Sequence, residues 1–178
     1  MEGLLFFMKI PHCHKFAIIG TGMVGTAIGF LLKKAGYKVA VIYDKSPAAL
    51  KRALPYTGGN IARKPSEILQ QADYILITTP DDFIASACRD IAASPDIKGK
   101  FVFHMSGGGG LDLLEAAKKA GASVASIHPL QSFSSIEQAI KNISGSYFGV
   151  TADKKASTHA KNIINKLGGI PIVISNNQ

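Results

Sequence analysis

The sequence predicts an α/β fold of the Rossmann type, with a doubly wound, mostly parallel sheet in a single domain. Two observations carry this prediction. Short apolar runs alternate with helical patterns along the whole chain, which is typical of βαβ proteins. The first apolar run also ends in Gly20-Thr-Gly22-Met-Val-Gly25, directly before a helical pattern. A length of 178 residues suits one such domain.

Composition narrows the class of protein. With 47% hydrophobic and 18% charged residues, the chain is globular rather than disordered. Its net charge of +8 favours anionic ligands, but no basic stretch is interleaved with aromatic residues, so we expect no nucleic-acid binding. Two cysteines far apart build no disulfide framework, and a reducing cytoplasm is the expected location.

Residues 1–14 are predicted to be an N-terminal extension before the first strand. The apolar run at residues 3–8 is too short for a signal sequence and lacks a basic segment before it. No run approaches the roughly 18 apolar residues of a membrane span, so we expect no membrane partner. His12, Cys13 and His14 are adjacent and cannot easily face one ion, so no metal site is predicted.

The glycine-rich turn after the strand at residues 16–19 is the first candidate site. Gly20 would permit the sharp turn, Gly22 would let the backbone approach a pyrophosphate, and Gly25 would let helix and strand pack closely. The free N–H groups at the start of the helix would hold the phosphate charge. The alternative is that these glycines serve only helix–strand packing. The predicted cofactor-binding residues of this turn are Gly20, Thr21, Gly22, Met23, Val24 and Gly25.

The second strand, residues 38–43, ends in Asp44-Lys45-Ser46-Pro47. An acidic residue at this distance from the glycine motif commonly accepts hydrogen bonds from the ribose hydroxyls of NAD, which makes Asp44 the candidate. Lys45 and Ser46 could instead hold a 2′-phosphate, so the sequence favours NADP, with NAD as the other possibility. Asp44 could also cap the helix that begins near Pro47.

The next segments are predicted to be a helix over 48–54 that stops before Pro55, a short helix over 65–72 and a buried parallel strand over 73–79. Ligands of open α/β sheets bind beyond the carboxyl ends of the strands. Thr79 and Pro80 are therefore predicted to face the cofactor. Asp81 or Asp82 is expected to be the N-cap of a helix over 83–93.

Two histidines end the following strands. His104 closes the strand at 100–104 and precedes Ser106 and four glycines, before a helix over 111–120. His128 closes the strand at 123–128. Both lie at the edge of the sheet that holds the glycine motif, so His104, Ser106 and His128 are the predicted catalytic residues. The alternatives are hydrogen-bonded core histidines and a flexible loop that only leads into the helix.

The remaining elements continue the alternation. We expect a short helix over 135–141, a strand over 147–151, a helix over 155–167 and a strand over 170–174. Pro171 places that last strand at an edge of the sheet, because proline cannot donate to a central ladder.

Four stretches together carry a family resemblance: Gly20-Thr-Gly-Met-Val-Gly25, residues 72–82, His104-Met-Ser-Gly107 and Ser126-Ile-His-Pro-Leu-Gln-Ser-Phe133. They resemble the Rossmann-like/DUF2520 proteins, which are NAD(P)-dependent oxidoreductases related to pyrroline-5-carboxylate reductase, β-hydroxyacid dehydrogenases and prephenate dehydrogenase. The resemblance implies that the loop at Ser106 faces the substrate near the nicotinamide. It also implies a C-terminal helical domain that closes the pocket and often forms a homodimer, and we expect the present chain to lack that domain.

The sequence therefore predicts the NAD(P)-binding domain of an oxidoreductase that transfers a hydride to or from a small, anionic substrate. A histidine would be the proton donor or acceptor. The alternative is a non-catalytic NADP-binding sensor or interaction module, because no catalytic lysine or carboxylate cluster is evident. A third, weaker interpretation is a domain for another phosphate ligand.

Overall fold

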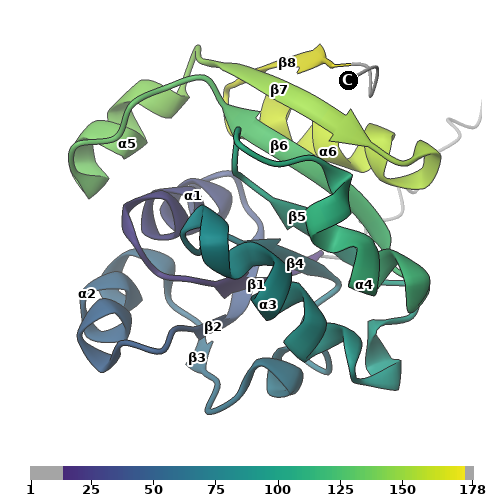
Figure 1. Ribbon diagram of the computed structural model, residues 1–178. Coiled ribbons are helices and arrows are strands. Elements are labelled where there is room, and N and C mark those ends of the chain that lie inside the picture. The colour runs from purple at the N-terminus through teal and green to yellow at the C-terminus, as the bar shows by residue number, and fades with distance from the viewer. Residues whose placement is uncertain (1–13, 175–178) are drawn as a thin grey trace, which may run out of the picture.

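The computed structural model describes residues 14–174, which form a single sheet covered by helices on both faces (Figure 1). The strands run in the order β3-β2-β1-β4-β5-β6-β7-β8, and all neighbours are parallel except β6 and β7. This confirms the doubly wound Rossmann-type fold. The strands are β1 (Lys15–Ile19), β2 (Lys38–Tyr43), β3 (Asn60–Ile61), β4 (Tyr74–Ile77), β5 (Phe101–His104), β6 (Ser123–Pro129), β7 (Tyr147–Ala152) and β8 (Ile170–Val173).

Two apolar layers hold the helices on the sheet. One layer joins α1, α5 and α6 to side chains such as Ile18, Phe103 and Ile127. The other joins α3 and α4 to side chains such as Ile75 and Val124 on the opposite face. The α-helices are α1 (Met23–Lys34), α2 (Pro47–Thr57), α3 (Asp81–Ala92), α4 (Glu115–Lys119), α5 (Ile136–Ile143) and α6 (Lys154–Lys166). The 3₁₀ helices are η1 (Pro65–Ile68), η2 (Pro95–Ile97) and η3 (Leu111–Leu114).

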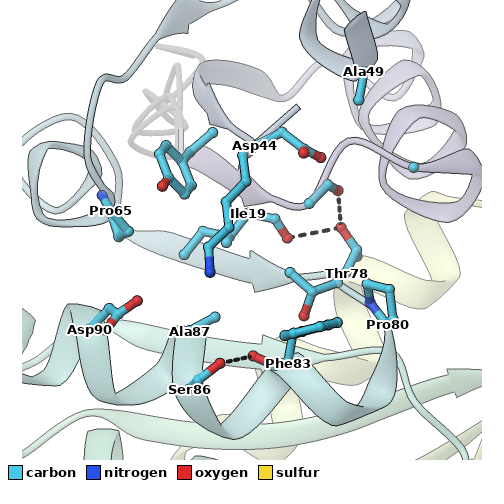
Figure 2. Close-up of a pocket in the computed structure, with 15 residues that line it drawn as sticks. Ile19, Asp44, Ala49, Pro65, Thr78, Pro80, Phe83, Ser86, Ala87 and Asp90 are labelled. Atoms are coloured by element: carbon cyan, nitrogen blue, oxygen red, sulfur yellow. Dashed lines mark hydrogen bonds between the residues drawn. The ribbon is translucent and has the colours of Figure 1, made fainter. Parts of the chain in front are cut away.

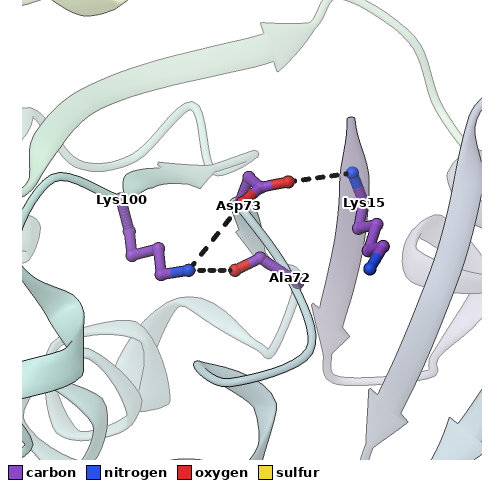
Figure 3. Close-up of polar contacts among 4 residues, drawn as sticks. All are labelled: Lys15, Ala72, Asp73 and Lys100. Atoms are coloured by element: carbon purple, nitrogen blue, oxygen red, sulfur yellow. Dashed lines mark hydrogen bonds and ion pairs between the residues drawn. The ribbon is translucent and has the colours of Figure 1, made fainter. Parts of the chain in front are cut away.

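The amino ends of the central strands are joined by polar contacts (Figure 3). Lys100 Nζ donates to the carbonyl oxygen of Ala72 at 2.8 Å and lies 3.8 Å from a carboxylate oxygen of Asp73. The other oxygen of Asp73 accepts a hydrogen bond from the backbone N–H of Lys15 at 3.3 Å. These contacts connect β1, β4 and β5 at the edge opposite the glycine-rich turn.

Three predicted elements differ in the structure. Helix α2 does not stop before Pro55 but continues to Thr57, and its buried residues include Ala53 and Thr57 on either side of the proline. The helix predicted over 65–72 is only the 3₁₀ turn η1, and the helix predicted over 111–120 is divided into η3 and α4.

Strand β8 lies at the edge of the sheet, as Pro171 predicted. Helix α6 covers one face of β7 and β8, where Phe148 is buried. Side chains alternate along a strand, so Tyr147 and its neighbour Ile170 point to the other face. Tyr147, Ile170 and Ile172 are 53%, 45% and 44% exposed, so within the described chain this face has no helix over it.

The extension predicted over residues 1–14 lies outside the described residues except for His14. None of the helices within residues 14–174 has the length and apolar character that a bilayer crossing requires.

Candidate functional site

Two adjacent pockets open at the carboxyl edge of the sheet, beside β1 and β4. The strand order reverses between these two strands, which is where open α/β sheets bind their ligands. The first, which we call the Asp44 pocket, has a volume of about 370 Å³. The second, the Ser106 pocket, has a volume of about 350 Å³. Both are lined by Gly22, Thr78, Thr79 and Pro80.

Two glycines of the predicted motif are explained by packing. Gly20 has a φ of +94°, and a Cβ there would lie 2.7 Å from the backbone nitrogen of Thr79. A Cβ at Gly25 would overlap both the carbonyl oxygen of Gly20 and Oγ1 of Thr78. Any side chain at either position would push β1, α1 and the end of β4 apart. The packing interpretation therefore accounts for these two glycines.

Gly22 is different, because a Cβ there would meet no atom within 4 Å. Its φ of −69° is one that any residue adopts, and no side chain caps the helix α1 that follows it. The N–H groups of Met23 and Val24 belong to the first turn of this helix, where the backbone has no acceptor of its own. Both residues line the Ser106 pocket. The turn thus presents free donors and an open space at the positive end of a helix dipole.

Asp44 joins the end of β2 to the glycine-rich turn. Its Oδ2 accepts from the backbone N–H of Thr21 at 2.6 Å and from Oγ1 of Thr21 at 3.1 Å. Its Oδ1 accepts from the backbone N–H of Ser46 at 2.8 Å. Asp44 is therefore not the cap of α2. The cap is Ser46, whose Oγ accepts from the N–H of Ala49 at 3.2 Å.

The groups predicted to surround the ribose do not all reach the Asp44 pocket (Figure 2). Asp44 and Lys45 line it, while Ser46 is not among its lining residues. The ammonium group of Lys45 lies 5.9 Å from the ring centroid of Phe83, a cation–π contact across the pocket. The structure therefore brings the Asp44 carboxylate and the Lys45 ammonium group together in this pocket. The hydroxyl of Ser46 instead caps α2.

Two threonines at the end of β4 have opposite environments. Thr78 Oγ1 donates to the carbonyl oxygen of Gly20 at 2.6 Å and so fastens the turn. Thr79 Oγ1 is buried and has no hydrogen-bond partner among the described residues. Leaving a buried hydroxyl unpaired costs about 1–3 kcal/mol. Thr79 lines both pockets, so this unpaired hydroxyl lies beside the place where they meet.

His104 is fully buried, and backbone groups occupy both of its ring nitrogens. The N–H of Ser106 donates to Nδ1 at 3.2 Å, so Nε2 carries the proton and donates to the carbonyl oxygen of Gly110 at 3.0 Å. Burial lowers the pKa of this imidazole below its ordinary value. His104 is not among the lining residues of either pocket, and its contacts close the glycine loop that follows β5.

Ser106 does reach the pocket that we name after it. Its Oγ accepts from the N–H of Gly108 at 3.0 Å, and its carbonyl oxygen accepts from Oγ of Ser126 at 3.4 Å. Asp81 lines the same pocket. A Cβ at Gly108 would lie 3.0 Å from Oδ2 of Asp81, so this carboxylate sits against the glycine loop.

His128 lies behind the loop rather than in the pocket. Its Nδ1 donates to the carbonyl oxygen of Met105 at 3.3 Å, which leaves Nε2 as an acceptor. A Cβ at Gly107 would overlap that imidazole ring, so the ring packs directly on the glycine. Neither pocket counts His128 among its lining residues. A catalytic role for His104, Ser106 or His128 stays a prediction.

Helix α3 contributes residues that sequence reasoning missed. Neither Asp81 nor Asp82 is the N-cap expected from the sequence, because α3 begins at Asp81 and both lie in its first turn after Pro80. Phe83, Ser86, Ala87 and Asp90 line the Asp44 pocket. Ser86, Ala87 and Asp90 follow Phe83 by three, four and seven residues, so the sequence could have predicted that they share one face of a helix. It could not have predicted what that face contacts.

Comparisons with known proteins agree with the Rossmann-type fold. A model of the Rossmann-like domain family matches residues 9–129. The chain is 33% identical to a ketol-acid reductoisomerase (NADP(+)) of Psychrobacter sp. (strain PRwf-1) over 91 residues, which are 51% of this chain and 26% of that protein.

Solved dehydrogenases and reductases have a similar fold. Prephenate dehydrogenase from A. aeolicus superposes with a TM-score of 0.74 at 18% identity, covering 91% of this chain and 60% of that one. Pyrroline-5-carboxylate reductase from Coxiella burnetii gives a TM-score of 0.75 at 16% identity, covering 93% and 60%. The chain thus spans less than two thirds of the length of these proteins. Because the family model covers most of its length, the chain belongs to the Rossmann-like domain family.

Proposed function

We propose that this chain binds a nicotinamide dinucleotide, NAD or NADP, and forms the nucleotide-binding part of an oxidoreductase. The observation that carries the proposal is the environment of Gly22. Packing explains Gly20 and Gly25, but the described residues give no packing reason for a glycine at position 22. An open backbone beside free N–H groups at a helix start is what a pyrophosphate requires.

Each of the two pockets would hold one part of the cofactor. The pyrophosphate would lie against the N–H groups at Gly22, Met23 and Val24, with its adenosine in the Asp44 pocket. The nicotinamide would enter the Ser106 pocket. Thr79, which lines both pockets and has an unpaired buried hydroxyl, would donate to or accept from the central part of the cofactor.

The relatives support an oxidoreductase of this kind. The similar proteins include a ketol-acid reductoisomerase (NADP(+)), a prephenate dehydrogenase solved with hydroxyphenyl propionate and NAD+, and a pyrroline-5-carboxylate reductase. We infer that the chain likewise serves a reaction on a small-molecule substrate, with the nicotinamide as the hydride donor or acceptor.

An anionic substrate needs a positive group that the Ser106 pocket does not itself contain. Among its lining residues the only charged one is Asp81, which is negative. The other lining residues carry no charge, and they include the apolar Met23, Met105 and Phe133 and the hydroxyl-bearing Ser106 and Thr79. If the substrate is an anion, as the sequence predicts, its countercharge comes from groups beyond this lining.

The side-chain positions favour NAD over NADP. Ser46 is the cap of α2, and the ammonium of Lys45 lies over Phe83, while the Asp44 carboxylate lines the pocket near the glycine-rich turn. A carboxylate there accepts from ribose hydroxyls and repels a 2′-phosphate. The sequence favoured NADP, so the two lines of reasoning point to different cofactors and a direct titration decides between them.

A non-catalytic sensor is the second candidate, and one observation favours it. The Ser106 pocket has no histidine or lysine among its lining residues, and the ring nitrogens of His104 are both engaged by backbone groups. A group that exchanges protons near neutral pH is therefore not in place at that pocket within residues 14–174. Turnover of NADH or NADPH with any carbonyl or imine compound would exclude this alternative.

The decisive experiment is a calorimetric titration with NADH and with NADPH at low and moderate salt. We expect binding in the micromolar range, weakened by salt because the pyrophosphate is held partly by charge. Gly22→Val should abolish binding while leaving circular dichroism unchanged and costing no more than about 1 kcal/mol of stability, because its side chain would enter open space and valine is only a poorer N-cap than glycine. Unchanged affinity in this variant would refute the proposal.

A further inference from the structure

One face of α3 forms a wall of the Asp44 pocket. Phe83, Ser86, Ala87 and Asp90 follow one another at helical spacing and all line it. Phe83 supplies an aromatic surface, over which the ammonium group of Lys45 lies 5.9 Å from the ring centroid, and Pro65 from η1 lines the same pocket. In Figure 2, Asp90 and Pro65 lie on one side of the pocket, and Phe83 lies on the other side with Thr78 and Pro80. A ligand with its phosphates at the glycine-rich turn would therefore extend its other end toward Asp90.

This end of the pocket offers hydrogen-bond acceptors. The Asp90 carboxylate forms no hydrogen bond and no ion pair with any residue in the 14–174 range. The Ser86 hydroxyl donates to the carbonyl oxygen of Phe83 at 2.9 Å, so only its lone pairs remain for a ligand. A ligand group placed here is best recognised if it carries N–H donors.

We propose that Asp90 recognises the exocyclic amino group of the adenine base, which lies in the pocket between Phe83 and Pro65. This inference rests on the proposed function and adds the residue that selects the base. The adenine amino group is a donor of two hydrogens, and a carboxylate accepts from it in a charge-assisted hydrogen bond. A deaminated base has a carbonyl oxygen at the same place, which the Asp90 carboxylate would repel.

Among the described residues, the Asp90 carboxylate makes no contact that would stabilise the fold. It lies near the end of α3 on an exposed position, and no described group is held in place by its carboxylate. A negative charge in the last turn of a helix is not favoured by the helix dipole. Replacing it with alanine should therefore leave the fold intact, so binding can be compared directly.

The test compares NADH with reduced nicotinamide hypoxanthine dinucleotide, in which the adenine amino group is replaced by oxygen. We expect the natural chain to bind the hypoxanthine form about 5- to 10-fold more weakly than NADH. A hydrogen bond to a solvent-exposed charge contributes a binding free energy at the low end of the range for charged hydrogen bonds. In Asp90→Ala the ratio of the two dissociation constants should fall to about one, because both ligands then lack the carboxylate. Asp82→Ala, on the same helix but outside both pockets, should keep the full ratio.

The outcomes separate this inference from the proposed function. Equal affinity of the natural chain for the two dinucleotides would overturn the role of Asp90 and leave the cofactor site standing. A ratio that persists in Asp90→Ala would also overturn it, by showing that another group reads the base. Binding of neither dinucleotide would refute the proposed function, and the base-selecting role with it.

Discussion

The Asp44 carboxylate accepts two hydrogen bonds from Thr21, one from its backbone N–H at 2.6 Å and one from its hydroxyl at 3.1 Å. These residues are 23 positions apart in the chain and meet because β2 lies beside β1. The same carboxylate lines the pocket proposed for the adenosine. One side chain thus shapes the glycine-rich turn and sets the charge that the ribose would meet.

The first prediction concerns cofactor choice at Asp44. Asp44→Asn keeps an oxygen that accepts from Thr21 N–H but removes the negative charge, so the affinity for NADPH relative to NADH should rise about tenfold. Calorimetric titration with both cofactors measures the ratio. Asp44→Ala should raise the ratio as well, because it also removes the charge, while loss of both bonds to Thr21 should lower the affinity for each cofactor. An unchanged ratio in Asp44→Asn would show that Asp44 does not face the 2′ position.

The second prediction separates the roles of two glycines. Gly25→Ala should lower the free energy of unfolding by about 1–3 kcal/mol, because its methyl group overlaps the carbonyl oxygen of Gly20. Gly22→Ser should leave stability nearly unchanged, since its side chain meets no atom and serine is a favourable N-cap. Urea unfolding of both variants measures the difference. Equal losses in the two would contradict the assignment.

The third prediction uses the unpaired hydroxyl of Thr79. Thr79→Val replaces a buried oxygen without a partner by a methyl group, so the ligand-free protein should become more stable by about 1 kcal/mol. Its affinity for the dinucleotide should fall in the same variant. Thr78→Val is the matched control and should lose stability, because Thr78 Oγ1 donates to Gly20. Thermal unfolding and titration together check both directions, and a destabilised Thr79→Val would refute the prediction.

The fourth prediction is a pH dependence of stability. Burial lowers the pKa of His104 below its value of 6.5 in the unfolded chain, and burial with nearby positive charge lowers that of His159 as well. A depressed pKa favours the neutral ring in the folded state. The stability is therefore fully present above about pH 6.5 and is lost as the pH falls from there through the folded-state pKa.

Urea unfolding at pH values from about 7.5 down to about 5, a range that spans the ordinary His pKa of roughly 6.5, tests this. Each histidine contributes a slope of at most about 1.4 kcal/mol per pH unit. His104→Gln should be less stable at pH 7.5 and should have a shallower slope below it, because one titrating group is gone. An identical slope in this variant would mean that His104 does not drive the acid sensitivity.

The fifth prediction concerns the proline inside α2. Pro55 cannot donate a backbone hydrogen bond to Lys51, four residues before it, yet the helix continues to Thr57. Pro55→Ala restores that donor, so the free energy of unfolding should rise by about 1–3 kcal/mol and the melting temperature by several degrees. Calorimetry measures the shift. A lower melting temperature would show that the rigid ring of Pro55 stabilises the turn at Gly58 instead.

The Rossmann-type architecture and most strand positions could be predicted because their signals are local. A buried parallel strand such as β4 is a continuous apolar run, and a strand that ends in Gly20-Thr-Gly22 before a helical pattern reveals a βα turn without knowledge of its neighbours. Pro171 likewise predicted that β8 lies at an edge, because proline has no backbone N–H to donate to a second neighbouring strand.

The partners of each polar side chain depended on the fold. His104 and His128 both lie at the predicted edge of the sheet. The loop between β5 and η3 folds back, however, and its backbone groups form hydrogen bonds with both ring nitrogens of His104. Ser46 rather than Asp44 caps α2, because Asp44 turns toward Thr21 on the neighbouring strand. Asp90 reaches the pocket only because α3 packs beside β4. Hydrophobic periodicity is encoded in neighbouring residues, whereas hydrogen-bond partners come from segments brought together by packing, and only the tertiary structure specifies them.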